Sequence, residues 1–203
     1  MQTSALPFHR RVADALADAP LRASLSSTTR KLLDGRANAL AALPDADRVR
    51  DHARAIRAHT VSRLDRYLAE FVTAAQARGT HVHWAADADE ARQQVVAIAA
   101  ASGTRLAVKS KSMVSEEVAL NAALEAAGIR VVETDLGEFV VQVAEDHPSH
   151  IITPIIHKSQ AQVARLFVER LGATEADVAD VPAITAFARR VLREQFLDAH
   201  LGI

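Results

Sequence analysis

The pattern of apolar and polar positions divides the chain into a helical first part and a second part in which short apolar runs alternate with helices. From Asp45 to Arg78, apolar residues recur at steps of three and four, which is the period of one helical face. Shorter patterns of the same kind predict helices over residues 7–19, 21–33 and 36–43. Because no convincing strand occurs before Gly79, residues 1–78 are predicted to be an N-terminal helical extension.

After this extension, regularly spaced glycines predict an α/β domain over residues 79–203. Gly79, Gly103 and Gly128 each end a helical pattern, and the three short runs rich in β-forming residues that follow them start 24 residues apart. Strands that alternate with helices at this spacing are typical of βαβ units and a parallel sheet. The predicted strands are His81–Trp84, Arg105–Val108, Ile129–Val132 and Ile151–Thr153, and the predicted helices are 87–102, 115–127 and 159–171.

Three segments of the second part have their own signals. Residues 139–143 fit a strand and a short helix equally well. Thr174 and Asp177 indicate a short capped helix, and Pro182 is placed to open a last one. Leu201–Ile203 reads as the beginning of another strand.

Composition narrows the classes of function. A hydrophobic share of 49%, a charged share of 24% and a net charge of −1 are those of a globular protein, without the basic surface that nucleic acid or an anionic membrane requires. The chain has no cysteine, so it offers no thiolate ligand, cysteine nucleophile or disulfide. No apolar run reaches the ~18 residues of a membrane span. We therefore expect a cytoplasmic protein with no nucleic-acid partner and no membrane span.

Polar residues gather in three loops that follow apolar runs, which is where an open α/β sheet usually binds its ligand. The first loop holds Lys109, Lys111 and Ser112, which together with a helix N-terminus would suit an anionic ligand such as a phosphate or carboxylate. The alternative is structural: Ser115 would cap the next helix, and the lysines would be solvated.

The second and third loops carry groups that could act as acids or bases. Glu133, Asp135 and Glu138 are candidates for a catalytic carboxylate, although a polar turn would have the same composition. His157 is a candidate proton carrier, and Lys158 beside it is a candidate ligand-binding residue. No metal site is predicted, because His81 and His83 have no third ligand nearby in the sequence.

The same loops carry a family resemblance. The stretches 108–113, 115–117, 132–138 and 148–152, with Asn121, Pro154 and the pair His157-Lys158, resemble the lactate utilization (LUD) domain family over the whole chain. The resemblance implies a fold similar to ribose-phosphate isomerases and CoA transferases. It also implies a part in oxidising L-lactate to pyruvate, with other lactate-utilization subunits as partners and with 4Fe-4S clusters held by cysteines in the full-length protein.

This chain lacks those cysteines and stops where the family continues. We therefore expect it to be the N-terminal part of an iron–sulfur electron-transfer protein, inactive alone, with no cofactor of its own and with half of a ligand site. Two alternatives stay open. The chain could be a non-catalytic docking platform for partner subunits through its long helix, or a sugar-phosphate or acyl-CoA enzyme of the same fold. A homo-oligomer is compatible with each of these readings.

Overall fold

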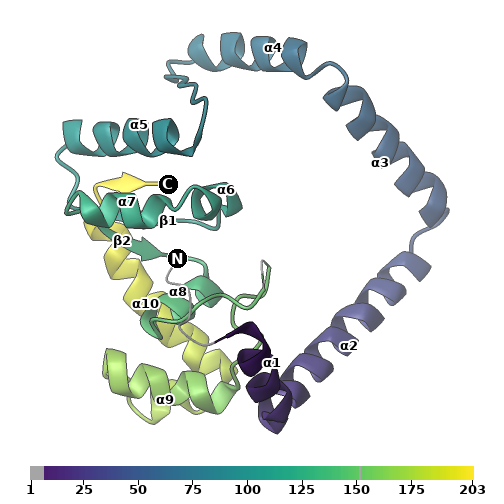
Figure 1. Ribbon diagram of the computed structural model, residues 1–203, viewed down its shortest axis with the longest axis vertical. Coiled ribbons are helices and arrows are strands. Elements are labelled where there is room, and N and C mark those ends of the chain that lie inside the picture. Colours follow the sequence, from purple (N-terminus) through teal and green to yellow (C-terminus); the bar gives the residue numbers. More distant parts are fainter. Residues whose placement is uncertain (1–6, 151) are drawn as a thin grey trace. The chain divides into compact units, whose positions relative to one another are not determined.

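A computed structural model of the chain describes residues 7–150 and 152–203 (Figure 1). These residues form two compact units: one contains the described residues up to Thr28 together with Ala86–Ile203, and the other is Thr29–Ala85. The sheet and the three polar loops belong to the first unit. The division at residue 79 stays a prediction.

The first unit is built on a parallel sheet, so the predicted α/β class is confirmed. Its described strands are β1 (Leu106–Lys109), β2 (Arg130–Glu133) and β3 (Leu201–Gly202), in the order β2-β1-β3. Leu106 pairs with Arg130 and Lys109 with Glu133, so β1 and β2 end at the same level. On the other side of β1, Ala107 pairs with Leu201, which confirms that the last residues enter a strand.

Helices cover both faces of this sheet (Figure 1). Leu106, Val108 and Val132 face a core made with α8 (Leu136–Val143), α9 (Gln160–Leu171) and α10 (Val181–Asp198). Alternate residues Ala107 and Val131 face the opposite side, against α5 (Ala88–Ala101) and α7 (Leu120–Ala126). This alternation is the two-residue period of a strand, and burial on both faces is what a parallel sheet needs.

Several helix boundaries follow the sequence signals. Asp87 caps α5 and Asp180 caps α10, with Pro182 in its first turn. Ser159 and Gln162 form a capping box at the start of α9, and Gly172 ends that helix at φ 68°. The predicted short helix near Thr174 is the 3₁₀ turn η1 (Ala176–Val178). The Thr174 hydroxyl donates to Asp177 Oδ2 and accepts from the backbone N–H of Asp177.

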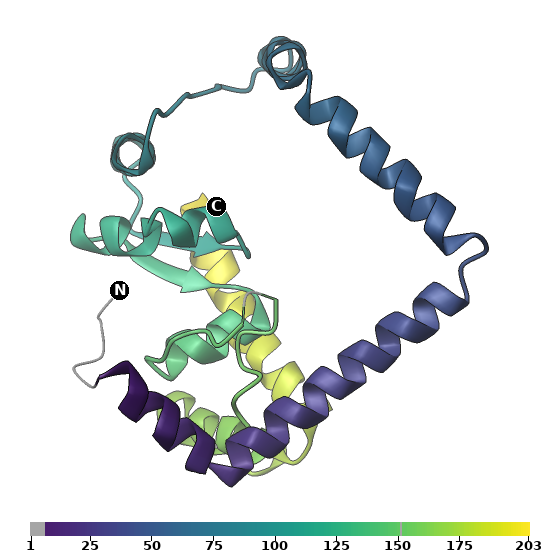
Figure 2. The same ribbon diagram turned by 45° about the vertical axis from the view of Figure 1, so that its right-hand side comes forward.

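The N-terminal helices differ from the prediction. After α1 (Phe8–Ala17), one continuous helix α2 (Ala19–Ala41) replaces the two predicted ones (Figure 2). Gly35 has no positive φ and does not end α2, because glycine inside a helix costs only about 1 kcal/mol.

The prediction of one long helix from Asp45 to Arg78 is also wrong, because the helix is interrupted near Ser62. It forms α3 (Ala46–Val61) and α4 (Leu64–Gln76). At the break, the hydroxyl groups of Thr60 and Ser62 donate to helix carbonyls, which weakens the regular ladder.

Two predicted strands are not formed in the described residues. Residues 81–84 and residues 152–153 have no strand assignment, and Ile151 lies outside the described residues. A β-rich run becomes a strand only when a neighbouring strand satisfies its backbone, and within residues 7–150 and 152–203 neither run is paired with one.

One further helix departs from expectation, and one segment that the sequence left open is resolved. The predicted helix 115–127 is split into α6 (Met113–Glu117) and α7 by Ala119 at φ 53°. Residues 139–143, which were ambiguous in the sequence, lie inside α8, where the side chain of Asp135 accepts two backbone N–H bonds at the N-cap.

Candidate functional site

The carboxyl ends of β1 and β2 hold a buried ion pair. Lys109 Nζ lies 2.8 Å from Glu133 Oε1 and donates a hydrogen bond to Ser115 Oγ at 3.1 Å. Lys109 is fully buried and Glu133 is 6% exposed. Because parallel register places these two residues opposite each other, both side chains point to the same face, toward α7. Two opposite charges removed from water require such pairing and further hydrogen bonds.

The elements around the pair satisfy most of its remaining polar groups. Asn121 on α7 donates from Nδ2 to Glu133 Oε1 at 2.7 Å. The backbone N–H of Glu133 donates to Gln142 Oε1, and Gln142 Nε2 donates to the carbonyl of Val131. The side-chain amide of Gln142 therefore makes the two backbone hydrogen bonds that a neighbouring strand would otherwise make at this edge of β2. Among the described residues, Glu133 Oε2 and Asn121 Oδ1 remain buried without a hydrogen-bond partner.

A second group of charges lies beside this pair. Lys111 Nζ is 3.4 Å from Asp135 Oδ1 and 3.6 Å from Glu138 Oε1, and it donates to the carbonyl of Ile152 at 3.3 Å. It therefore joins all three loops. The loops also approach closely through glycine: a Cβ on Gly137 would lie 3.0 Å from Pro154, so a larger residue would push the third loop away.

The carboxyl group of Glu138 has a pKa close to neutral pH. Its pKa is raised to about 7: burial is the largest cause, the Glu116 carboxyl adds to the rise, and Lys111 opposes both effects. Two ionised carboxylates repel, so the neighbouring Glu116 carboxyl favours the protonated form of Glu138. Glu138 can therefore hold or release a proton near pH 7, which is the property of a general acid or base.

The third loop forms a separate polar group around Asp146. Its Oδ2 accepts from Lys158 Nζ at 2.6 Å and lies 3.1 Å from His157 Nε2, while Ser149 Oγ lies 2.7 Å from His157 Nδ1. Partial burial tends to raise the pKa of Asp146, but hydrogen bonds from Lys158, the His147 backbone and His157 hold it well below its usual range. Asp146 is therefore ionised at neutral pH.

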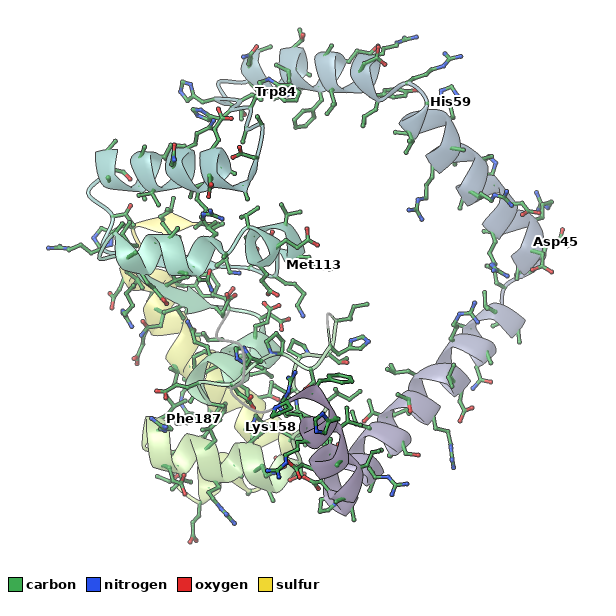
Figure 3. All side chains as sticks on the ribbon, in the orientation of Figure 1. Asp45, His59, Trp84, Met113, Lys158 and Phe187 are labelled. Carbon is green, nitrogen blue, oxygen red and sulfur yellow. The ribbon has the colours of Figure 1, made fainter. Side chains whose placement is uncertain are left out.

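This third group opens onto a cavity of about 410 Å³ within the first unit. Ser149, His157 and Lys158 line it from the loop side, and Lys158 is labelled there in Figure 3. The first helices of the chain line its other wall with residues that include Pro20, Leu21 and Leu25. A hydrogen bond of 2.9 Å from Ser24 Oγ to the carbonyl of Ile156 ties the two walls together.

Comparison with known proteins identifies the family. Residues 68–203 match the LUD domain, which covers both polar groups at the sheet and the loop around Asp146. The chain belongs to the LUD domain family. Among curated relatives, the proteins named "Lactate utilization protein B" of Bacillus cereus (strain AH820), Bacillus thuringiensis (strain Al Hakam) and Bacillus anthracis (strain CDC 684 / NRRL 3495) are each 39% identical to it over 203 residues.

These matches cover the whole chain but only 42% of each relative's length. No solved structure matches the chain significantly. The expected likeness to ribose-phosphate isomerases and CoA transferases therefore stays a prediction. In the described part of the LUD domain chain, no helix is long and apolar enough to cross a bilayer.

The LUD domain brings the predicted site residues together in three separate groups rather than in one cluster. Lys109 lies with Glu133, Lys111 with Asp135 and Glu138, and His157 with Lys158. Ser112 caps α6 by accepting from the Ser115 backbone N–H, so the expectation that Ser115 is the cap is wrong by three residues. The ligand-binding and catalytic roles of these side chains stay predictions.

The sequence predicted no role for three residues that complete the polar groups of the three loops. Asn121 had entered only through the family resemblance, and Gln142 and Asp146 had not been singled out. Asn121 and Gln142 act through contacts between different elements, for which one sequence carries no signal. For Asp146, a faint signal exists: an acid shortly before the His157-Lys158 pair could have been considered as their partner.

The buried pair predicts a specific stability pattern. Lys109→Met should lower the free energy of unfolding by about 3–5 kcal/mol, because it leaves the Glu133 carboxylate buried without its counter-charge. Lys109→Met combined with Glu133→Gln should lose less, since no buried charge then remains. Urea unfolding followed by circular dichroism measures both. As a control, Arg66→Met removes the exposed pair with Glu70 and should cost less than about 1 kcal/mol. A double variant less stable than the single one would contradict this account.

The raised pKa of Glu138 predicts how stability depends on pH. A carboxyl whose folded-state pKa is raised from 4.5 to about 7 stabilises the fold below pH 4.5, and this contribution is lost as pH rises through 7. The free energy of unfolding of Glu138→Gln, compared with that of the wild type, should therefore rise by on the order of 2 kcal/mol as the pH increases from 5 to 8. Lys111→Met should move the transition to higher pH. Unfolding curves at several pH values test this, and a pH-independent difference would refute it.

Proposed function

We propose that the chain is part of a lactate-utilization protein that takes part in the oxidation of L-lactate to pyruvate. The observation that carries the proposal is the 39% identity to proteins named "Lactate utilization protein B" across all 203 residues of the chain. The chain spans 42% of their length, so the activity is proposed for the full-length protein.

Within the chain, we assign the ligand to the edge of the sheet beside Lys111. Lys109 is fully buried by its partners, and Ser112 is occupied as a helix cap, so both act as supports for the site. The Lys111 side chain keeps 27% of its surface exposed and can attract a small carboxylate. Glu138, 3.6 Å from Lys111 Nζ, is placed to accept the proton that an α-hydroxyl group must lose when it becomes a carbonyl.

Iron–sulfur clusters and electron transfer are part of the proposal only for the full-length protein. Cluster iron is held by cysteine thiolates, and this chain contains no cysteine. The residues present therefore do not fit such a group, and its ligands would have to come from outside residues 1–203. We assign no step of the reaction to it here.

Growth on lactate tests the proposed role. Deleting the full reading frame that encodes the chain should abolish growth of the host on L-lactate as sole carbon source and leave growth on glucose unchanged. Supplying the frame on a plasmid should restore growth, and supplying it with Lys111→Met and Glu138→Gln together should restore it poorly. Normal growth of the deletion strain on L-lactate would reject the role, provided that no second copy of the gene is present.

A second candidate function is supported by the apolar surface of Thr29–Ala85, the second unit. Helices α3 and α4 have no buried residue among those described, and Ile56, Val61 and Phe71 are each more than half exposed. Apolar groups gathered along helices usually mark a protein contact. This surface could hold another lactate-utilization subunit, as the docking alternative requires.

Substitution on these helices tests the docking role. Ile56→Glu with Phe71→Glu should prevent an affinity-tagged full-length protein from co-purifying with other lactate-utilization proteins identified by mass spectrometry. Arg50→Glu with Arg66→Glu, on exposed charged positions of the same helices, is the matched control and should leave the complex intact. Equal recovery of the same partners with the apolar positions changed would exclude this surface.

A further inference from the structure

The loop between α8 and α9 arranges a serine, a histidine and an aspartate in one hydrogen-bonded row. Ser149 Oγ is 2.7 Å from His157 Nδ1, and His157 Nε2 is 3.1 Å from Asp146 Oδ2. Both distances are within hydrogen-bond range. A hydroxyl paired with an imidazole that is itself oriented by a carboxylate is the arrangement that activates a serine for nucleophilic attack.

The charge on Asp146 decides which imidazole nitrogen carries the proton. Asp146 Oδ1 accepts from the backbone N–H of His147 at 2.7 Å, and Oδ2 accepts from Lys158 at 2.6 Å, so the carboxylate is held in its ionised form. An ionised carboxylate only accepts hydrogen bonds, and therefore His157 donates to it from Nε2. In a neutral imidazole the other nitrogen, Nδ1, is then free to accept the Ser149 proton.

The row faces a cavity that could hold a ligand. Its volume of about 410 Å³ is within the usual range for small-molecule sites. Ser149, His157 and Lys158 form a polar wall. The opposite wall contains the apolar Pro20, Leu21 and Leu25, together with Asp18 and Ser24. The N-terminus of α9 begins beside Lys158, with Ser159 and Gln162 also in the wall. The positive end of a helix and an ammonium group both favour an oxygen that gains negative charge.

We propose that Ser149 is a nucleophile, with His157 as its general base and Asp146 as the residue that positions the imidazole, in a site for small activated acyl esters. Nothing in the proposed lactate role uses these three groups, so this activity is additional to it. The apolar side chains of the opposite wall would receive the acyl chain. The polar wall would hold the reacting carbonyl.

The reaction balances without a cofactor. Ser149 Oγ forms a bond to the carbonyl carbon while its proton passes to His157 Nδ1. The bond from that carbon to the leaving oxygen then breaks, and the leaving alcohol takes the proton from Nδ1. A water molecule repeats the two steps on the acyl-serine, which releases the carboxylic acid and restores Ser149.

Labelling with an alkyl fluorophosphonate tests the site in the 203-residue chain. The wild type should incorporate one label per chain, located on Ser149 by peptide mass spectrometry. Ser149→Ala should incorporate none. His157→Gln keeps hydrogen-bonding groups but removes the base, and should lower the labelling rate about 100-fold.

The role of Asp146 is tested by measuring the labelling rate and the final number of labels per chain separately. Asp146→Asn should slow labelling by at least about 10-fold while still reaching one label per chain, and Asp146→Glu should recover part of the rate. Ser102→Ala is the control: Ser102 is not among the residues that line the cavity, and its hydroxyl donates to the carbonyl of Ile98. This variant should label within about twofold of the wild-type rate.

The outcomes that would overturn the proposal are equally specific. They are an unlabelled wild type, a label on any residue other than Ser149, or a wild-type rate in His157→Gln. Circular dichroism of each variant shows whether it is folded, so a loss of labelling in a folded His157→Gln protein supports the base directly.

Discussion

The contact between Lys109 and Glu133 is the constraint on which the rest of the domain depends. A lysine and a glutamate that are almost entirely removed from water must stay together, and they can do so only if β1 and β2 are parallel and in their observed register. A shift by one residue would turn one of the two side chains to the opposite face of the sheet. The ion pair therefore helps to specify the register at the edge where the polar loops meet.

The buried pair also determines which charges remain available to a ligand. Lys109 was a natural candidate for anion binding, but its ammonium group is enclosed by Glu133 and Ser115. The adjacent Lys111 is the lysine that reaches partly exposed surface at this edge, where it contacts all three loops. With the pKa of Glu138 raised to about 7 beside it, the edge combines a cation with a group that can carry a proton.

The loop around Asp146 shows how a second polar group can be independent of the first. Asp146 holds His157 and Lys158 with one oxygen, so neither side chain turns toward the sheet edge. The cavity beside them is completed by the first helices of the chain, which lie far away in the sequence. The domain thus separates an acidic, lysine-bridged edge from a serine–histidine–aspartate row, and the two arrangements suit different chemistry.

The sequence by itself determined the α/β class, the positions of β1 and β2, the extents of α5 and α9, the start of α10 near Pro182, and the loops in which polar residues gather. These features are local, since they depend on periodicity, on caps such as Ser159 and on a glycine such as Gly172 that accepts a positive φ. Only the tertiary structure decided that residues 81–84 form no strand and that the helix after Asp45 is interrupted. It alone showed that Asn121, Gln142 and Asp146 complete the polar groups. Each of these outcomes depends on which partner a backbone or side-chain group finds across the fold, and a single sequence does not record those partners.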